Sequence, residues 1–259
     1  MDWSGEPERL ASEIEDRWAA LNRHCADRSS RLRLGRLLLR LNHRDAGVQE
    51  SALAELELAT QLIRAGAYVA FLPESQARTA DLECHIGRER LFVEVTAMVG
   101  SPARRRPPLR SRLDKEGQDE EEDRGVMLIH RVLARISQKS KQLTDYRDPV
   151  VLSISIPRAD LKGPRRKRRE EIRLDLKQLA GAVTVLLQTL PLLSAVLITL
   201  WDVTPLPARA ATRLVNVDLA ERTKHQKGHP RVRLMIKNPS ASASLTDWQE
   251  EMFRQILQH

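Results

Sequence analysis

Three acidic residues, Glu55, Asp81 and Glu94, stand where a helix and two strands of the expected structure could converge. The last two fall in stretches with strand-like alternation, residues 79–85 and 91–96, and a short polar turn containing a glycine predicts that these stretches form a hairpin. Because strand side chains alternate between the two faces of a sheet, Asp81 and Glu94 can meet on one face.

Two carboxylates held side by side repel each other, which raises the pKa of at least one of them unless a cation lies between them. An oxygen-rich cluster of this kind suits a hard divalent ion, Mg²⁺ or Mn²⁺. A single acidic residue on a strand is more often simply solvated, so the metal prediction depends on the ordered set of three. The residues alone indicate Asp81 and Glu94 as a pair of metal ligands, with Glu55 as the third acid that could converge with them.

The residue order around these acids resembles that of the PD-(D/E)xK nuclease superfamily, and is most similar to the archaeal Holliday-junction resolvases and the Mrr-like restriction enzymes. The order is a helix with a glutamate, a glycine, a strand, Asp-Leu-Glu, a hairpin and Val-Glu-Val-Thr. In that family an aspartate begins the second strand, a glutamate lies in the third, and a helix glutamate often joins the metal site. The resemblance implies that Asp81 and Glu94 hold the metal. It also implies Glu55 as the helix acid, because the spacing to the helix-ending Gly66 fits the family, with Glu57 as second choice. Glu55 would complete the metal shell directly or through water.

The family also carries a lysine two residues after the strand glutamate, which helps to position and activate the attacking water. This sequence has Thr96 there. In the family a helix follows this strand and borders the site, and here that helix is expected over residues 126–143. It could supply the missing ammonium group, with Lys139 and Lys141 as the candidates and Gln142 as a polar helper. The alternative is an ordinary one, because a lysine near a helix C-terminus offsets the helix dipole.

Positive charge predominates in the chain, with a formal net charge of +8 and a sequence pI of about 9.9. A basic surface favours a polyanionic partner, nucleic acid before membrane, although abundant arginine is also typical of GC-rich genomes. The densest basic run is expected in a loop, where it would contact the nucleic-acid backbone without reading sequence. It consists of Arg165, Arg166, Lys167, Arg168 and Arg169.

A second basic stripe follows one side of the helix expected over residues 31–42 and continues just beyond it. It consists of Arg33, Arg36, Arg40 and Arg44. A helix of this kind can lie on phosphates or on anionic lipid. The alternative is a helix that docks on the core through its leucines and leaves its arginines solvated.

The remaining sequence features exclude several classes of protein. The two cysteines, Cys25 and Cys84, lack the spacing of a zinc site; a disulfide between them is left open, and Cys84 is expected in the core. The N-terminus has no secretory signal, and the longest apolar stretch, near residues 183–200, is too interrupted to span a bilayer. We find no glycine-rich phosphate loop, nucleotide fingerprint or Ser-His-Asp order. We therefore expect a soluble, cytoplasmic protein.

The hydrophobic periodicity predicts alternating helices and strands along most of the chain. Helices are expected over residues 8–24, 31–42, 49–65, 126–143, 172–190 and 245–258. Strands are expected over 68–72, 79–85, 91–96, 150–156, 195–201, 212–217 and 231–236, the last two at sheet edges. Residues 1–47 form an expected N-terminal helical extension and residues 48–259 a nuclease-like domain. Residues 101–125, with opposite charge blocks and prolines, are expected to be a mobile insert.

The expected fold class is α/β, a restriction endonuclease-like mixed central sheet flanked by helices. The expected function is hydrolysis of phosphodiester bonds by a Mg²⁺- or Mn²⁺-dependent endonuclease, with DNA preferred over RNA as partner and a homodimer as an option. The alternative is a catalytically inactive protein of the same fold that binds nucleic acid or serves a structural role, because the neutral Thr96 cannot replace an ammonium group. The expected catalytic residues are Glu55, Asp81, Glu94, Lys139, Lys141 and Gln142.

Overall fold

The computed structural model describes residues 6–25, 27–73, 80–98, 119–143, 146–156, 172–201, 203–206, 215–224 and 229–258, with side chains described except at 6–13, 46 and 119–123. The helices are α1 (Glu6–His24), α2 (Arg28–Leu41), α3 (Ala46–Arg64), α4 (Asp119–Ser140), α5 (Leu176–Leu187) and α6 (Asp247–Gln258). The strands are β1 (Tyr68–Phe71), β2 (Leu82–Ile86), β3 (Glu89–Ala97), β4 (Val150–Ile156), β5 (Ile172–Leu174), β6 (Ala195–Leu200), β7 (Val203–Pro205), β8 (Val217–Glu221) and β9 (Val232–Lys237).

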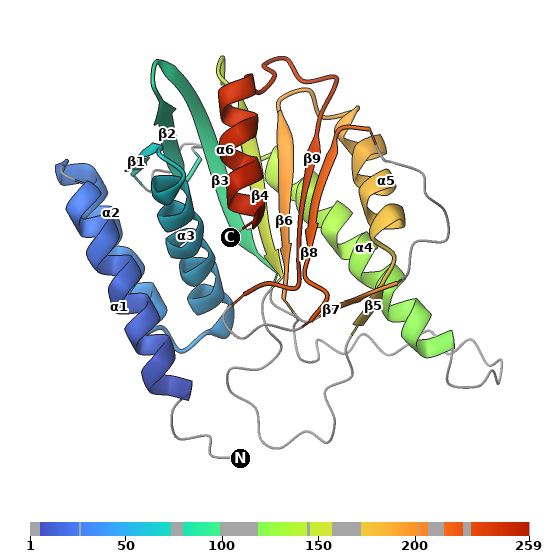
Figure 1. The fold of residues 1–259 in the computed structure, drawn as a ribbon, viewed down its shortest axis with the longest axis horizontal. Helices are drawn as coiled ribbons and strands as arrows, with labels where there is room; N and C mark the ends of the chain where they lie inside the picture. Colours follow the sequence, from blue (N-terminus) through green and yellow to red (C-terminus); the bar gives the residue numbers. More distant parts are fainter. Residues whose placement is uncertain are drawn as a thin grey trace.

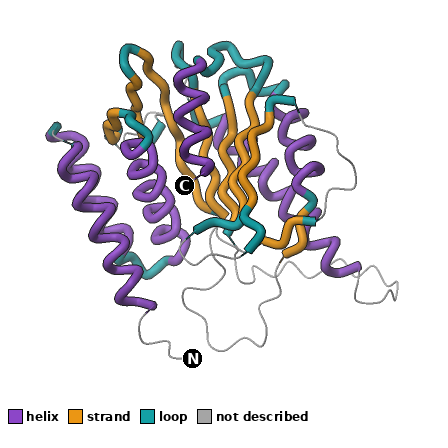
Figure 2. Tube along the Cα trace, viewed as in Figure 1, coloured by secondary structure: helices purple, strands orange, loops and turns teal. Residues whose placement is uncertain are grey.

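A mixed seven-stranded sheet forms the centre of the molecule, in the order β1-β2-β3-β4-β6-β9-β8 (Figure 1). Strands β3, β4 and β6 are parallel, whereas β1, β2 and β3 form an antiparallel meander and β9 pairs antiparallel with β6 and β8. A separate pair, β5 and β7, lies at one end of the molecule (Figure 2). The prediction of a mixed α/β fold with a central sheet flanked by helices is confirmed.

Two helical layers cover the two faces of the sheet. One layer holds α1, α2, α3 and α6, and the other holds α4 and α5 (Figure 1). Strand β3 contributes to both layers, because Val93 and Val95 pack toward α3 whereas Phe92 packs on the side of α4. The sheet therefore separates two hydrophobic cores, and a side chain on β3 can face only one of them.

Helix caps and glycine turns set the boundaries of the elements around the acidic residues. Asp27 caps α2 by accepting a hydrogen bond from the backbone N–H of Ser30, and Asp45 caps α3 in the same way. Each such cap contributes about 1 kcal/mol. Gly66, with φ of +90°, follows the end of α3, and Gly87, with φ of +60°, lies in the β2–β3 turn, as the sequence predicted.

The N-terminal helices belong to the same core as α3. Leu34 and Leu37 of α2 are fully buried and join the cluster that contains Leu56 and Leu62 of α3. Helix α2 also contacts β1. This packing brings one side of α2 toward the strands that carry the acidic residues. Within the described residues, no helix combines the length and the apolar character needed to cross a lipid bilayer.

The prediction of a mobile insert over residues 101–125 is wrong for its last part, because helix α4 begins at Asp119. Acidic residues in the first turns of a helix are favoured by the helix dipole, which explains how the acidic block extends the helix. Gly125 permits a close contact: a Cβ there would lie 2.4 Å from the carbonyl oxygen of Arg173 in β5. Residues 101–118 lie outside the described part of the chain, as does the basic run Arg165–Arg169.

Two predicted elements in the C-terminal half also need correction. The helix expected over residues 172–190 starts only at Leu176, because Asp175 caps it and residues 172–174 form β5 beside β7. The strand β9 is not at an edge, since it lies between β6 and β8. The strand expected over 212–217 begins at Val217, and residues 212–214 lie outside the described part.

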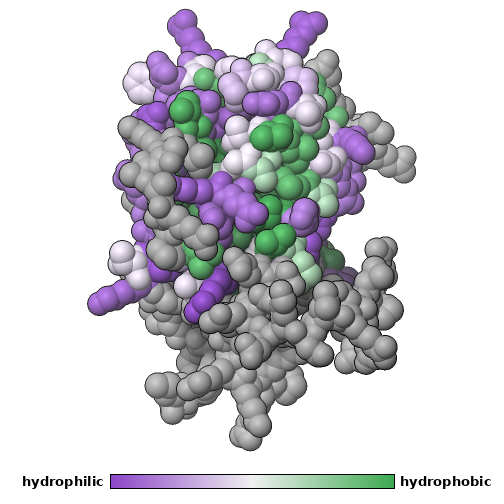
Figure 3. Space-filling view, turned by 90° about the vertical axis from the view of Figure 1, so that its right-hand side faces the viewer, coloured by the Kyte–Doolittle hydropathy of each residue, from purple (hydrophilic) through white to green (hydrophobic). Residues whose placement is uncertain are grey.

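The helical period would place Trp248 of α6 on the same side as the buried Met252, four residues later, but the Trp248 side chain is 71% exposed. The buried side is formed by Gln249, Met252, Phe253, Ile256 and Leu257. Other apolar side chains reach the surface as well, and Figure 3 shows a group of them on the face with α4 and α5, where Met127 and Val185 are exposed.

Candidate active site

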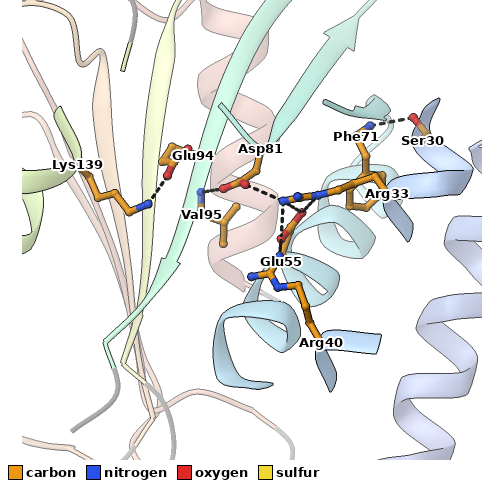
Figure 4. Close-up of polar contacts among 9 residues, drawn as sticks. All are labelled: Ser30, Arg33, Arg40, Glu55, Phe71, Asp81, Glu94, Val95 and Lys139. Atoms are coloured by element: carbon orange, nitrogen blue, oxygen red, sulfur yellow. Dashed lines mark hydrogen bonds and ion pairs between the residues drawn. The ribbon is translucent and has the colours of Figure 1, made fainter. Parts of the chain in front are cut away.

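Asp81 and Glu94 lie opposite each other on the β2–β3 hairpin. The register pairs Leu82 with Val93, so Asp81, just before β2, stands across from Glu94. The backbone N–H of Asp81 donates to the carbonyl oxygen of Val93 over 3.1 Å, and the N–H of Val95 donates to Oδ2 of Asp81 over 2.8 Å (Figure 4). The hairpin therefore fixes both the backbone and the carboxylate of Asp81.

Lys139 reaches Glu94 from α4. Glu94 follows Phe92 by two residues and so faces the α4 layer, where the Nζ of Lys139 donates to its Oε1 over 2.6 Å (Figure 4). The side chain of Lys139 is 21% exposed and that of Glu94 is 9% exposed. Lys141 and Gln142 are exposed residues of the turn after α4. Of the three residues expected from this helix, Lys139 is the one that contacts a carboxylate among the described contacts.

Glu55 lies on the other side of β3, on α3, and is bound by two arginines from α2. The Nη2 of Arg33 lies 3.1 Å from Oε1 of Glu55, and the Nη1 of Arg40 lies 3.1 Å from Oε2 (Figure 4). The side chain of Glu55 is 3% exposed, that of Arg33 5% and that of Arg40 28%. Both carboxylate oxygens of Glu55 are thus engaged by guanidinium groups.

Arg33 links Glu55 to Asp81. Its Nη2 also donates to Oδ1 of Asp81 over 3.0 Å. One turn earlier on α2, the hydroxyl of Ser30 accepts a hydrogen bond of 2.9 Å from the backbone N–H of Phe71 at the end of β1. This contact ties α2 to the sheet next to Asp81. The guanidinium group of Arg33 can therefore contact both Glu55 on α3 and Asp81 on the hairpin.

The site is a row of alternating charges, with the two neighbouring carboxylates as the one exception. In order, the groups are Arg40, Glu55, Arg33, Asp81, Glu94 and Lys139. Three carboxylates and three cationic groups give the row a formal charge of zero. The row has the composition of a buried ion-pair network. Removing one member would leave its partner as an uncompensated buried charge and destabilise the fold.

Burial dominates the electrostatics of both glutamates. It raises the pKa of Glu94 to about 7; the adjacent Asp81 adds to this rise and the Lys139 ammonium opposes it. Burial also raises the pKa of Glu55, again with a contribution from Asp81, while Arg33 and Arg40 act against it. Asp81 and Glu94 therefore behave as a carboxylate pair that a further cation would stabilise.

The donors of the site fit a divalent ion in part. Asp81 and Glu94 offer neighbouring carboxylate oxygens, the type of ligand that Mg²⁺ and Mn²⁺ take. Glu55 does not fit as a third ligand in this arrangement, because Arg33 and Arg40 engage both of its oxygens. Accordingly, no group of three or more His, Cys, Asp or Glu side chains among the described residues is arranged to hold a metal ion. Whether Glu55 takes part in a metal site, directly or through water, stays a prediction.

Tyr146 positions the segment before Asp81 and was not identified from the sequence. Its hydroxyl accepts a hydrogen bond of 2.8 Å from the backbone N–H of Ala80, and its ring stacks on Phe92 with centroids 4.1 Å apart. A tyrosine in a loop before a strand has no local pattern that marks this role. The contact depends on β3 and β4 being neighbours, which only the tertiary structure fixes.

Arg33 and Arg40 were expected to face phosphates, lipid or water, and that expectation is wrong for both. Arg33 is buried, and both side chains bind Glu55. Their spacing carried a usable signal, because Arg33 lies one turn from the buried Leu37 and Arg40 nearly one turn beyond it, on the same side of the helix. Arg33 and Arg40 therefore lie on the packing side of α2, whereas Arg36 and Arg44 of the same basic stripe are exposed.

Comparisons of the chain with models of protein families, with characterised proteins and with solved structures gave no match in any of the three cases. What the site can do is accordingly inferred from its own residues.

Proposed function

We propose that this protein is a metal-dependent nuclease that hydrolyses phosphodiester bonds, with DNA as the first substrate to test, on a restriction endonuclease-like core formed by α3, β1, β2, β3, α4 and β4. The order of these elements matches the resemblance of the sequence: a helix with an acid, three strands with acids in the second and third, and a helix beside the site. The parallel pairing of β3 with β4 then returns the chain to the same sheet. The observation that carries the proposal is the contact between Lys139 and Glu94.

The roles of the residues follow from their charges. Asp81 and Glu94 would hold Mg²⁺ or Mn²⁺ between them, and the bound ion would polarise the phosphate and lower the pKa of a water molecule. Lys139 carries the ammonium group that Thr96 lacks, and its Nζ is 2.6 Å from Glu94. A cation fixed at this point can stabilise the negative charge that develops during phosphodiester cleavage. Glu55 acts on Asp81 indirectly, through Arg33.

The test is incubation of the purified protein with supercoiled, linear and branched DNA, and with RNA, in Mn²⁺, Mg²⁺ or EDTA. We expect cleavage that requires the metal and is lost in Glu94→Gln and Asp81→Asn. An Arg28→Gln variant, which changes an exposed residue at the start of α2, serves as the matched control. Absence of cleavage of every substrate in Mn²⁺, or cleavage that persists in both carboxylate variants, would overturn the proposal.

A second candidate function is binding without cleavage. Two observations favour it: the row of ion pairs is internally neutral, and Thr96, 5% exposed, occupies the position of the family's lysine. A chain of this kind would bind nucleic acid through its basic segments and use the acidic residues for stability. Metal binding separates the two functions, since only the nuclease requires a Mn²⁺ site that Asp81→Asn removes.

A further inference from the structure

Arg33 places a positive charge on Asp81 from a helix outside the expected core. A single nitrogen, Nη2, lies 3.0 Å from Oδ1 of Asp81 and 3.1 Å from Oε1 of Glu55. The side chain of Arg33 is 5% exposed, that of Glu55 3% and that of Asp81 21%, so the pair with Glu55 is shielded from water and the pair with Asp81 is partly shielded. This cation occupies the space between two acids that the sequence suggested as metal ligands.

We propose that Arg33 is an internal cation that competes with a divalent metal ion for Asp81, so that the resting protein binds the metal weakly until the contact is broken. The inference rests on the proposed function, because it assumes that Asp81 and Glu94 form the metal site. It adds a regulatory element, α2, to that site.

The competition follows from the contacts of Asp81. Its Oδ2 accepts the backbone N–H of Val95 over 2.8 Å, and its Oδ1 accepts the guanidinium of Arg33. A metal ion that binds Asp81 must share or displace these donors. A doubly charged ion beside a guanidinium is also repelled by it, and this repulsion is strong where water is excluded. Metal binding and the Arg33–Asp81 pair therefore oppose each other.

The contacts of α2 make this competition adjustable. Three contacts attach the same side of α2 to its neighbours. Ser30 accepts the N–H of Phe71, Arg33 binds Asp81, and Arg40 binds the second oxygen of Glu55. A shift of α2 would withdraw Arg33 from Asp81 while Asp81 stays fixed to the hairpin through Val95. The affinity of the site for the metal ion would then depend on the position of α2, and would rise when α2 moves away.

The experiment measures Mn²⁺ binding to the full chain without substrate, by calorimetry and by electron paramagnetic resonance. We compare the wild type with Arg33→Gln, which removes the charge, Arg33→Lys, which keeps it, and Arg28→Gln as the matched control. We expect Arg33→Gln to lower the Kd for Mn²⁺ by about tenfold or more, since a repulsion between like charges is removed. Arg33→Lys and Arg28→Gln should stay near the wild-type value, and adding Asp81→Asn to Arg33→Gln should abolish the gain.

Each outcome decides the proposal. Equal or weaker Mn²⁺ binding in Arg33→Gln than in the wild type would overturn the competition while leaving the proposed function in place. Absence of Mn²⁺ binding to both proteins would overturn the competition and the proposed function together. If Arg33→Gln does not fold in the absence of metal, circular dichroism in Mn²⁺ replaces the titration. Recovery of the fold by Mn²⁺ supports the proposal, because the ion then replaces the missing cation. Failure to recover the fold contradicts the proposal.

Discussion

Substitution of Lys139 tests whether the row of charges serves catalysis or only stability. The ammonium group of Lys139 is 2.6 Å from Glu94, whereas Lys141, two residues later, is exposed. If Lys139 stabilises developing negative charge, Lys139→Met should reduce metal-dependent cleavage by about a hundredfold, the effect of removing one such donor in other active sites. The rate of cleavage of supercoiled DNA under single-turnover conditions measures this loss.

The comparison variant for Lys139 is Lys141→Met, which removes the same charge from the exposed turn and should leave the rate within about twofold, since distant surface charges are screened by salt. Mn²⁺ binding should persist in both variants, because Asp81 and Glu94 are unchanged. Equal losses of activity in the two variants would contradict the assignment to Lys139.

The raised pKa of Glu94 predicts a pH-dependent stability. The ordinary pKa is 4.5 and the folded value about 7, so between these values the folded protein binds more protons than the unfolded chain. Stability should therefore be highest below pH 4.5 as far as Glu94 is concerned, fall as the pH rises toward 7, and then level off, with a total change of no more than about 3 kcal/mol. Urea unfolding across this range measures the change.

Glu94→Gln is the variant that tests the pH effect, because an amide does not titrate. We expect it to reduce the fall in stability between pH 4.5 and 7 relative to the wild type, with the remaining fall due to Glu55, whose pKa burial also raises. Saturating Mn²⁺ should reduce the same slope in the wild type, because a bound cation favours the charged carboxylate. An unchanged slope in Glu94→Gln would show that another group is responsible.

Helix α2 is attached to α3 through Glu55, whose neutralisation leaves Arg33 and Arg40 without their shared partner. Breaking one member of a buried ion-pair network typically costs about 3–5 kcal/mol. We therefore expect Glu55→Gln to lower the free energy of unfolding by that amount while Asp81 and Glu94 still bind Mn²⁺. Glu251→Gln, at an exposed ion pair of α6, should change stability by less than about 0.5 kcal/mol. Loss of Mn²⁺ binding in a folded Glu55→Gln protein would instead make Glu55 a ligand.

The placement of α4 depends on Gly125. A methyl group there would lie 2.4 Å from the backbone oxygen of Arg173, so α4 and β5 would have to move apart. We expect Gly125→Ala to reduce stability by about 1–3 kcal/mol, as overpacking does. Gly181→Ala in α5 is the control, since no atom lies within 4 Å of its added Cβ and alanine favours a helix. Thermal melts of both variants measure the difference, and a Gly125→Ala protein as stable as the wild type would contradict the close contact.

Local patterns were sufficient where the side-chain period and the turn residues agreed. Alternation around Gly87 placed Asp81 opposite Glu94, and the helical period identified α3 and α4. Local patterns failed where a distant element decides the orientation of a side chain. The inward side of α2 depends on the buried acid on α3, and the exposure of Trp248 depends on how α6 lies on the sheet. The short strand β5 likewise requires β7, far along the chain, as its partner.

At the scale of the whole molecule, the excess positive charge lies outside the site. The chain has a formal net charge of +8, while the six charged groups of the site sum to zero. Under the proposed function, attraction of a polyanion would come from other basic residues, and cleavage from the site itself. Binding and cleavage are therefore separable, both in experiments and in the two candidate functions.

The basic run Arg165–Arg169, outside the described residues, is the strongest sequence candidate for this attraction. Each phosphate contact releases counterions and contributes about −0.9 to the slope of log K against log salt on duplex DNA. Replacing all five residues with glutamine should therefore weaken binding and make the slope less negative by up to about 4.5. Fluorescence anisotropy in EDTA, with labelled duplex DNA of several sequences, measures binding without cleavage. We expect a similar loss for each sequence, since phosphate contacts carry no base information. An unchanged slope would mean that the nucleic acid approaches through another surface. The Asp81→Asn protein should retain the wild-type slope, because the substitution removes no basic residue that contacts phosphate.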